Sequence, residues 1–314
     1  MPAIGLHDIK LRPGHASLEP RLGAYYLDMS EALVLAENGH HGPLDEAGVP
    51  KYDFGAAGQF YNTTLISQYA IILHDTMLAQ GRTPDMERKF VAQLNALDAN
   101  IEKDGNWKGF ALNRWDSPRH PELRAPWVSA LSQGNILSAL LRGHQLLGDG
   151  SLLDLAHLVF GALERPMSQG GARCVGRRGH LWFEEYPMDP PSHVLNGFIF
   201  ALWGVLDYAR TTNHKKAWDW WHDGVKTLTD RLPDYDCGYW SLYDLREREL
   251  ASLYYQTNIH IPQLQVMHQL TGFDIFETYA TRWEKFSASP LRRAQWWVAL
   301  RVNARMPRRH RVGR

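Results

Sequence analysis

The sequence predicts a mainly α-helical fold in which helical hairpins form a ring with the loops collected at one mouth. Two observations support this: the pairing of helical segments across short turns, and the position of the polar–aromatic clusters between the pairs. Four pairs of amphipathic segments occur between residues 62 and 286, and a short turn of small or polar residues separates the two segments of each pair. Turns this short make the two helices antiparallel neighbours. Longer segments rich in Trp, Tyr and Arg join successive pairs and hold the polar–aromatic clusters. An ordinary α-helical bundle with decorated loops is the alternative.

The chain before the first pair is less regular. Residues 1 to about 24 are expected to form an irregular arm, and Tyr25–Asn38 one helix that ends at Gly39. Residues 39–62 form a long loop interrupted by Gly and Pro. Loops of this length are usually functional or linkers.

The helical pairs follow in order. Thr83 and Pro84 occupy the cap and the first position of one helix, as is typical of helix starts. Two β-hairpins are expected between pairs, one with its turn at Gly176–Gly179 and Leu181–Tyr186 as return strand, the other over Tyr235–Tyr243. Pro290 begins a last amphipathic helix. The expected pairs are 62–80 with 84–103, 128–147 with 151–164, 193–210 with 214–232, and 258–270 with 273–286.

Composition excludes several classes. Lys+Arg and Asp+Glu are both 34, so no overall field favours nucleic acid or a membrane surface. Cys174 and Cys237 are the two cysteines, which is neither a disulfide framework nor a metal-binding spacing. No secretory signal and no membrane-spanning run is visible, so we expect a cytoplasmic protein. The His40-His41 pair has no third ligand at a sensible spacing, so no metal is expected.

One stretch predicts a polar pocket. Residues 181–186 alternate with a period of two, as a strand does, and prolines at 187, 190 and 191 stop it. Ser192 is expected to cap the helix that follows. Glu185, Tyr186 and Asn196 would then meet at the pocket floor. The alternative is an aromatic-rich strand with exposed acids.

A second cluster lies further along the chain. Tyr243 and Arg246 are three residues apart at a strand-to-turn junction, so both could face one site. Tyr254 and Tyr255 precede a helix whose N-terminus favours an anion. No nucleophile elbow, phosphate loop or dinucleotide fingerprint is present. Adjacent glutamates on opposite strand faces suit glycoside hydrolysis poorly.

These residues resemble the C-terminal domain of the D-glucuronyl C5-epimerases over about residues 48 to 287. The β-sandwich module of the family's animal members is missing here, and one extra residue precedes His260. The family's catalytic tyrosine is therefore best matched by Tyr255, with Tyr254 as the alternative. The resemblance implies an incomplete α/α toroid. The matching blocks are 48–50 with 58–61 and 66–69, 102–107, 127–130 with 133–134, 182–187, 194–198, 243–246, and 260–261 with 263–265.

The resemblance implies a uronate C5-epimerase acting on a glucuronate-containing, heparosan-like polysaccharide. Glu185 and Tyr255 are the expected proton-transfer groups, and Tyr243 and Tyr186 are second acid/base groups or hydrogen-bonding walls. Arg246 would bind the uronate carboxylate. The remaining expected substrate contacts are Asn196, Ser129, Gln133, Trp127 and Tyr254. Loop arginines that could hold an acidic chain are Arg114, Arg119, Arg124, Arg173, Arg177 and Arg178.

The implied organisation is an N-terminal arm and helix over 1–47, a catalytic domain over 48–290, and a C-terminal helix with a basic tail over 291–314. No cofactor is expected, because the chemistry needs none. The expected partner is an anionic polysaccharide, without nucleic acid or a membrane span, and a homodimer is one compatible state. A polysaccharide lyase shares the first proton abstraction and is the nearest alternative. A non-catalytic glycan-binding protein is the other.

Overall fold

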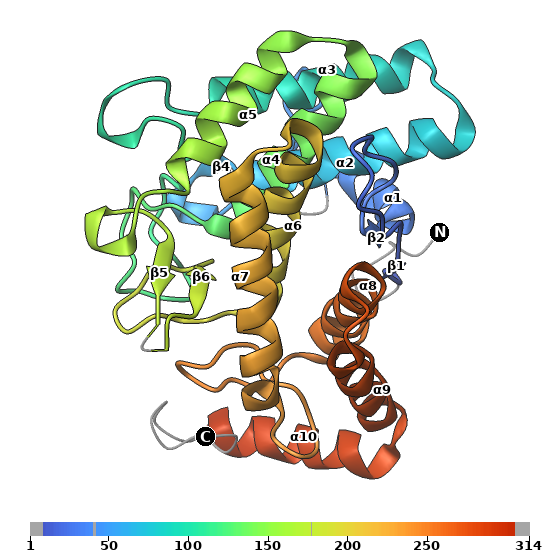
Figure 1. Cartoon of the computed structure of the whole chain (residues 1–314), viewed down its shortest axis with the longest axis vertical. Helices are drawn as coiled ribbons and strands as arrows, with labels where there is room; N and C mark the ends of the chain where they lie inside the picture. Colours follow the sequence, from blue (N-terminus) through green and yellow to red (C-terminus); the bar gives the residue numbers. More distant parts are fainter. Residues whose placement is uncertain (1–8, 40–41, 177, 305–314) are drawn as a thin grey trace.

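The computed structural model describes residues 9–304 except 40, 41 and 177. The fold is mainly helical with small antiparallel β-hairpins, which confirms the predicted class (Figure 1). Each expected helical pair is present. The first helix of each pair is the more buried one and is called inner, and the second is called outer. The inner helices are α2 (Thr63–Gln80), α4 (Ala130–Leu147), α6 (Leu195–Thr212) and α8 (Ile261–Thr271). The outer helices are α3 (Pro84–Ala99), α5 (Gly150–Ala162), α7 (Lys215–Arg231) and α9 (Asp274–Ala288).

Side-chain caps fix where several helices begin. The Asn62 side chain accepts hydrogen bonds from two backbone N–H groups of the first turn of α2. Thr83 caps α3 with Pro84 as its first residue, as the sequence predicts. Asp149 caps α5. Gly148 and Gly272 end α4 and α8 in the left-handed conformation, which glycine adopts without strain.

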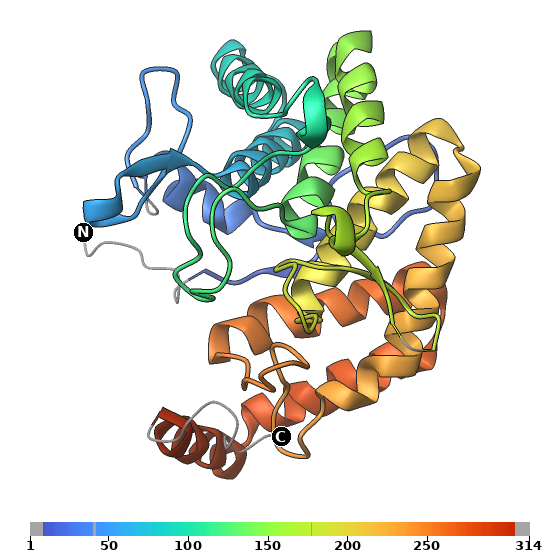
Figure 2. The same cartoon turned by 90° about the vertical axis from the view of Figure 1, so that its left-hand side faces the viewer.

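The inner helices α2, α4 and α6 pack side by side, and the close approach of α4 to α6 depends on glycine. A Cβ on Gly204 would lie 2.2 Å from the carbonyl oxygen of Gly134. Residues 130–143 of α4 and 195–210 of α6 are buried throughout. Figure 2 shows these helices at the centre of the molecule, with α10 (Pro290–Ala304) at one end.

The expected helix over Tyr25–Asn38 is wrong. Instead β1 (Arg12–Pro13) pairs with β2 (Leu27–Asp28), and a short helical stretch follows as η2 (Ser30–Ala32) and α1 (Leu33–Glu37). Tertiary contacts explain the extended backbone. The N–H of Tyr25 donates to Asp75, and the hydroxyls of Tyr25 and Tyr26 reach Asn135 and Asp207. These contacts override local helix propensity.

The same arm joins distant parts of the fold. Its strands contact α8, and η2 and α1 contact α2, so the arm links the first and last inner helices. The Tyr26 side chain of the arm contacts a buried ion cluster formed by Asp207, Arg142 and Arg210. The carboxylate of Asp207 lies 2.6 Å from Arg142 and 3.3 Å from Arg210, and accepts the Tyr26 hydroxyl at 2.7 Å.

The hairpins differ in part from the prediction. The loop over residues 39–62 contains an unpredicted hairpin of β3 (Lys51–Asp53) and β4 (Gln59–Tyr61). The hairpin of β5 (Arg173–Val175) and β6 (Leu181–Phe183) is confirmed, with shorter strands. The segment over 235–243 forms isolated bridges rather than paired strands. The remaining short helices are η3 (Gly55–Ala57), η4 (Gly105–Trp107), η5 (Met167–Gln169), η6 (Leu232–Tyr235) and η7 (Tyr255–His260).

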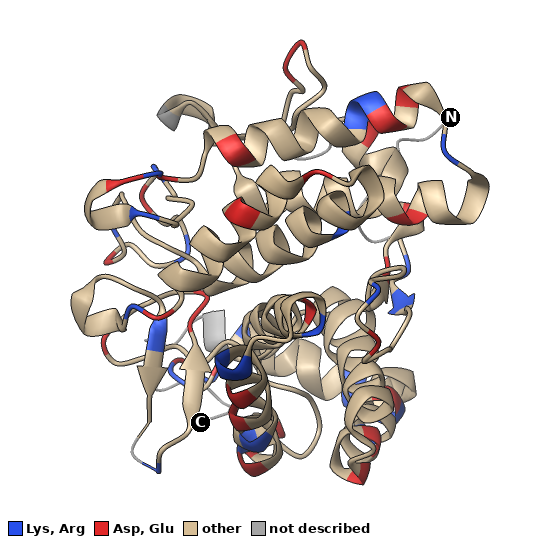
Figure 3. Ribbon diagram, turned by 45° about the horizontal axis from the view of Figure 1, so that its top comes forward, with Lys and Arg blue, Asp and Glu red and all other residues tan. Residues whose placement is uncertain are grey.

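Ser192 does not cap α6 as predicted, because its hydroxyl donates to Glu184 instead. Acidic and basic residues are mixed over the helices rather than separated by sign (Figure 3). Among the described residues, no helix combines the length and the apolar character needed to cross a bilayer. Both cysteines are free thiols.

Candidate active site

A cavity of about 460 Å³ reaches from the N-terminal arm to the segment before α8. It is lined by side chains from the arm, β3, α2, the loop over 113–119, the start of α4, the end of the β6 strand, α6 and η7. The cavity brings together most of the residues predicted from the sequence. Those among its lining residues are Trp127, Ser129, Glu185, Tyr186, Asn196, Tyr254 and Tyr255.

Glu185 lies two residues after the end of β6 and is 8% exposed. Its Oε1 accepts a hydrogen bond of 3.2 Å from the Tyr243 hydroxyl. Burial raises its pKa to about 7, although Tyr186, Arg119 and Tyr243 act in the opposite direction. The carboxylate lies against the first turn of α6, where a Cβ on Gly197 would be 2.3 Å from its Oε2. Glycine at this position therefore makes room for the acid.

The tyrosines around Glu185 are neutral phenols. Burial, followed by the charge of Glu185, raises the pKa of Tyr243 and of Tyr186 well above the ordinary value. The same two causes raise the pKa of Tyr255 to about 12. The rings of Tyr243 and Tyr255 pack edge to face with centroids 5.1 Å apart. Tyr243 thus contacts both of the predicted proton-transfer groups.

Arg119 is the cavity-lining arginine nearest this group. Its guanidinium lies 4.2 Å from the centroid of the Tyr243 ring and 2.7 Å from Glu249. Burial disfavours the charged guanidinium, but the carboxylates of Glu249 and Glu185 favour it, and the net effect raises the pKa of Arg119. Sequence reasoning placed Arg119 only among the loop arginines. It lies 66 positions before Glu185 (185 − 119), so only the tertiary fold brings the two together.

Three predicted site residues lie outside the cavity lining: Tyr243, which contacts Glu185 and Tyr255 from behind it, and the expected substrate contacts Arg246 and Gln133. Arg246 is 18% exposed, and its Nη1 lies 3.0 Å from Glu122 and 2.9 Å from the sulfur of Met188. The side-chain amide of the fully buried Gln133 accepts a hydrogen bond from the Ala111 N–H and donates one to the Gly109 carbonyl. It therefore stabilises the loop at these two residues. The other loop arginines, where described, are likewise not cavity-lining residues.

Polar groups suited to sugar hydroxyls do line the cavity. The Oδ1 of Asn196 is buried and has no hydrogen-bond partner among the described residues. Ser129 lies at the N-cap of α4, where its hydroxyl accepts from the Ser132 N–H at 3.5 Å. The Trp127 ring packs on Tyr186 with centroids 5.8 Å apart. Asn113 and Trp115, which the sequence did not single out, line the same cavity.

The segment that carries Tyr255 is a π-helix over Tyr255–His260. A π turn holds about one residue more than an α turn, so it would accommodate the extra residue that the resemblance implies before His260. Burial lowers the pKa of His260 to about 3, and its Nδ1 lies 3.1 Å from the Ser241 hydroxyl. The same segment contributes Tyr255 to the cavity.

Possible metal ligands lie elsewhere. His40 and His41 are outside the described residues. Within residues 9–304, apart from the gaps, two groups have ligand atoms close enough to share an ion. One is the partly buried group Cys174, Glu184 and His193, and the other is His268 with two exposed acids, Asp274 and Glu277.

Comparison with known proteins supports one family. The family described as D-glucuronyl C5-epimerase C-terminus matches residues 102–285, more than half of the chain. A D-glucuronyl C5-epimerase of Caenorhabditis elegans is 31% identical over 175 residues, 52% of this chain and 28% of that protein. An uncharacterized protein of Methanocaldococcus jannaschii is 31% identical over 162 residues, 51% of this chain and 52% of that protein. The chain thus spans about half of one relative and about a quarter of the other. It belongs to the D-glucuronyl C5-epimerase C-terminal family.

Proposed function

We propose that this protein is a uronate C5-epimerase acting on a glucuronate-containing, heparosan-like polysaccharide. One observation carries the proposal: a carboxyl group with a pKa of about 7, a neutral phenol and an arginine line a single cavity. The name of the related Caenorhabditis elegans protein agrees with this chemistry. Epimerisation removes the C5 proton, which is alpha to a carboxylate, and returns a proton to the other face.

Glu185 is proposed to exchange a proton on one face of the sugar ring. An acid/base group works best when its pKa lies near the working pH, because both protonation states are then accessible. An ordinary glutamate is a weak base for a carbon acid. Burial raises the pKa of Glu185 to about 7 and so makes the carboxylate more basic.

Tyr255 is proposed to act on the opposite face. Its raised pKa keeps the hydroxyl protonated, so the phenol can donate to the carbanion when Glu185 has taken the C5 proton. One turnover leaves a protonated Glu185 and a Tyr255 phenolate. Resetting the site requires a proton to pass from the acid to the phenolate. Tyr243 contacts both groups, which favours a relay through its hydroxyl.

The developing charge on the substrate needs a cation. We propose Arg119 for this role in place of Arg246, because Arg119 lines the cavity whereas Arg246 does not. A guanidinium has five N–H donors in a planar fork, so Arg119 can bind Glu249 and a substrate carboxylate together. A fixed cation stabilises the enolate-like intermediate more than the ground state.

Binding of the polymer is proposed to use the remaining cavity walls. Asn196 and Ser129 offer polar atoms for sugar hydroxyls, and Trp127 offers an aromatic wall. Tyr254 lines the cavity next to Tyr255. On the same proposal, residues 48–290 form the catalytic unit, and its helical pairs form an incomplete α/α toroid whose loops surround this cavity.

The test is hydrogen–deuterium exchange at C5 in deuterated water, using N-deacetylated, desulfated heparosan and other uronate polymers. We expect deuterium at C5 and iduronate signals in the NMR spectrum, with both abolished in Glu185→Gln. New ultraviolet absorbance from an unsaturated uronate would identify a lyase instead. Polymer binding without exchange would identify a glycan-binding protein and reject the proposed activity.

A further inference from the structure

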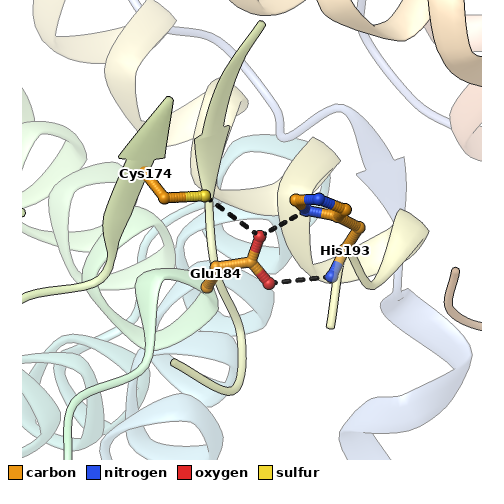
Figure 4. A group of neighbouring side chains, drawn as sticks. All are labelled: Cys174, Glu184 and His193. Carbon is orange, nitrogen blue, oxygen red and sulfur yellow. Dashed lines mark hydrogen bonds and ion pairs between the residues drawn. The ribbon is translucent and has the colours of Figure 1, made fainter. Parts of the chain in front are cut away.

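A compact group of side chains lies next to the cavity but contributes nothing to its lining. Cys174 is on β5, Glu184 follows β6, and His193 precedes α6 (Figure 4). Glu184 points away from the neighbouring Glu185, because successive residues of an extended chain face opposite sides. One ligand atom from each of the three side chains lies within 4.8 Å of the other two. None of these residues has a role in the proposed epimerisation.

The carboxylate of Glu184 is the centre of the group. Its Oε1 lies 2.6 Å from the Nδ1 of His193 and accepts the Cys174 thiol at 3.7 Å. Its Oε2 accepts the Ser192 hydroxyl and the His193 N–H, both at 2.8 Å. Trp182 stacks on the His193 ring with centroids 4.1 Å apart. The three possible ligands are therefore held by the surrounding structure.

We propose that Cys174, Glu184 and His193 bind a divalent cation of the zinc type, with a water as fourth ligand. Thiolate, imidazole and carboxylate are the donors that zinc uses in proteins. The side chain of Glu184 is 0% exposed and that of His193 is 19% exposed, so one side of the group can admit an ion and a water.

The geometry needs only a small adjustment. Zinc bonds of about 2.0–2.3 Å in a tetrahedron place neighbouring ligand atoms roughly 3.3–3.7 Å apart. The 3.7 Å between the Cys174 sulfur and Glu184 already fits. The 2.6 Å between Glu184 and the His193 nitrogen must lengthen by about 0.8 Å, since the ion replaces the hydrogen bond between them. Rotation of the partly exposed imidazole supplies that movement.

Charge balance favours the ion, because a divalent cation matches the two anionic ligands, the Glu184 carboxylate and the Cys174 thiolate. A bound cation would displace the thiol proton of Cys174 to solvent and leave the thiolate as ligand, with the His193 proton on Nε2. The ion would neutralise the buried carboxylate and connect the β5–β6 hairpin to the start of α6. Binding of the ion does not depend on the proposed function.

Cobalt provides a direct test, because Co²⁺ occupies zinc sites and a thiolate ligand gives it a charge-transfer band in the near ultraviolet. We expect the full-length protein to bind one equivalent of Co²⁺ with this band, and Zn²⁺ to displace it. Cys174→Ser should lose the band. His193→Asn should weaken binding at least tenfold; Asn is chosen because residue 193 has a φ of 50°, which asparagine tolerates. Cys237→Ser is the matched control, since it removes the other free thiol and should bind as the wild type does.

Three results would overturn the site. No saturable Co²⁺ or Zn²⁺ binding would do so, as would an unchanged band in Cys174→Ser. Binding without a thiolate band would place the ion elsewhere, for example at His268 and its neighbouring acids. Circular dichroism of each variant distinguishes a lost ligand from a lost fold.

Discussion

Replacing Glu185 with glutamine should make the stability of the protein depend differently on pH. The pKa of Glu185 is raised from 4.5 to about 7, so the folded state holds this proton more tightly than the unfolded chain does. Its contribution to stability is fully present below about pH 4.5 and is lost as the pH rises through about 7. Glutamine does not titrate. The free energy of unfolding of Glu185→Gln should therefore rise relative to that of the wild type as the pH increases.

The magnitude follows from the shift of about 2.5 units (7 − 4.5), at about 1.36 kcal/mol per unit. Between about pH 5 and about pH 8, the difference between variant and wild type should grow by ~2.5 kcal/mol. Because only the change of this difference with pH is compared, the pH-independent effect of burying an amide in place of a carboxyl group cancels. Guanidinium unfolding followed by tryptophan fluorescence measures the free energy of unfolding at each pH. Over the same range, the epimerisation rate of the wild type should increase through about pH 7, since the base must be ionised.

Glu284→Gln is the control, because this glutamate is exposed on α9. Its stability difference from the wild type should stay constant over the same pH range. If the difference for Glu185→Gln also changes by less than about 0.5 kcal/mol, the carboxylate is not desolvated. Glu185 would then not be a near-neutral acid/base group.

The remaining predictions concern the cavity. Tyr255→Phe should lower epimerisation by roughly 10²–10⁴ with little change in polymer binding, whereas Tyr254→Phe should stay near wild type; the reverse would move the acid to the neighbouring residue. Arg119→Lys should lower turnover more than Arg246→Lys does in the same kinetic assay, because Lys lacks the planar fork; a larger loss at Arg246 would restore the carboxylate contact there. Gly197→Ala should abolish exchange in a folded protein, since its Cβ would lie 2.3 Å from the Glu185 carboxylate; wild-type exchange would show that this carboxylate moves freely.

Local sequence signals were sufficient for the helical pairs. Thr83 with Pro84, and Asp149, are caps whose effect depends on the next few residues alone. The arm could not be predicted in the same way. Tyr25 and Tyr26 have helix-compatible neighbours, but their hydroxyls bond to residues on α4 and α6 that are remote in sequence. Tertiary contacts decide the backbone there.

The candidate site, like the fold, could be predicted from the sequence only in part. Glu185 and Asn196 could be placed together because a strand, a short loop and a helix connect them. The choice between Arg119 and Arg246 could not be made, because both arginines lie in irregular segments. The three-residue spacing from Tyr243 indicated Arg246 as the contact for the substrate carboxylate, yet its side chain contacts Glu122 and Met188. Only the path of the loop over 113–119 brings Arg119 to the cavity.

The buried contact between the arm and α6 has a consequence for how the chain folds. Tyr26 is synthesised well before its partner Asp207, which lies 181 residues later in the chain. Arg210 likewise donates to the carbonyl of Glu19 across 191 residues. Contacts so distant in sequence close large loops and form late. We expect the arm to remain undocked until α6 has left the ribosome. The inner helices should acquire their final stability only when the arm docks on them.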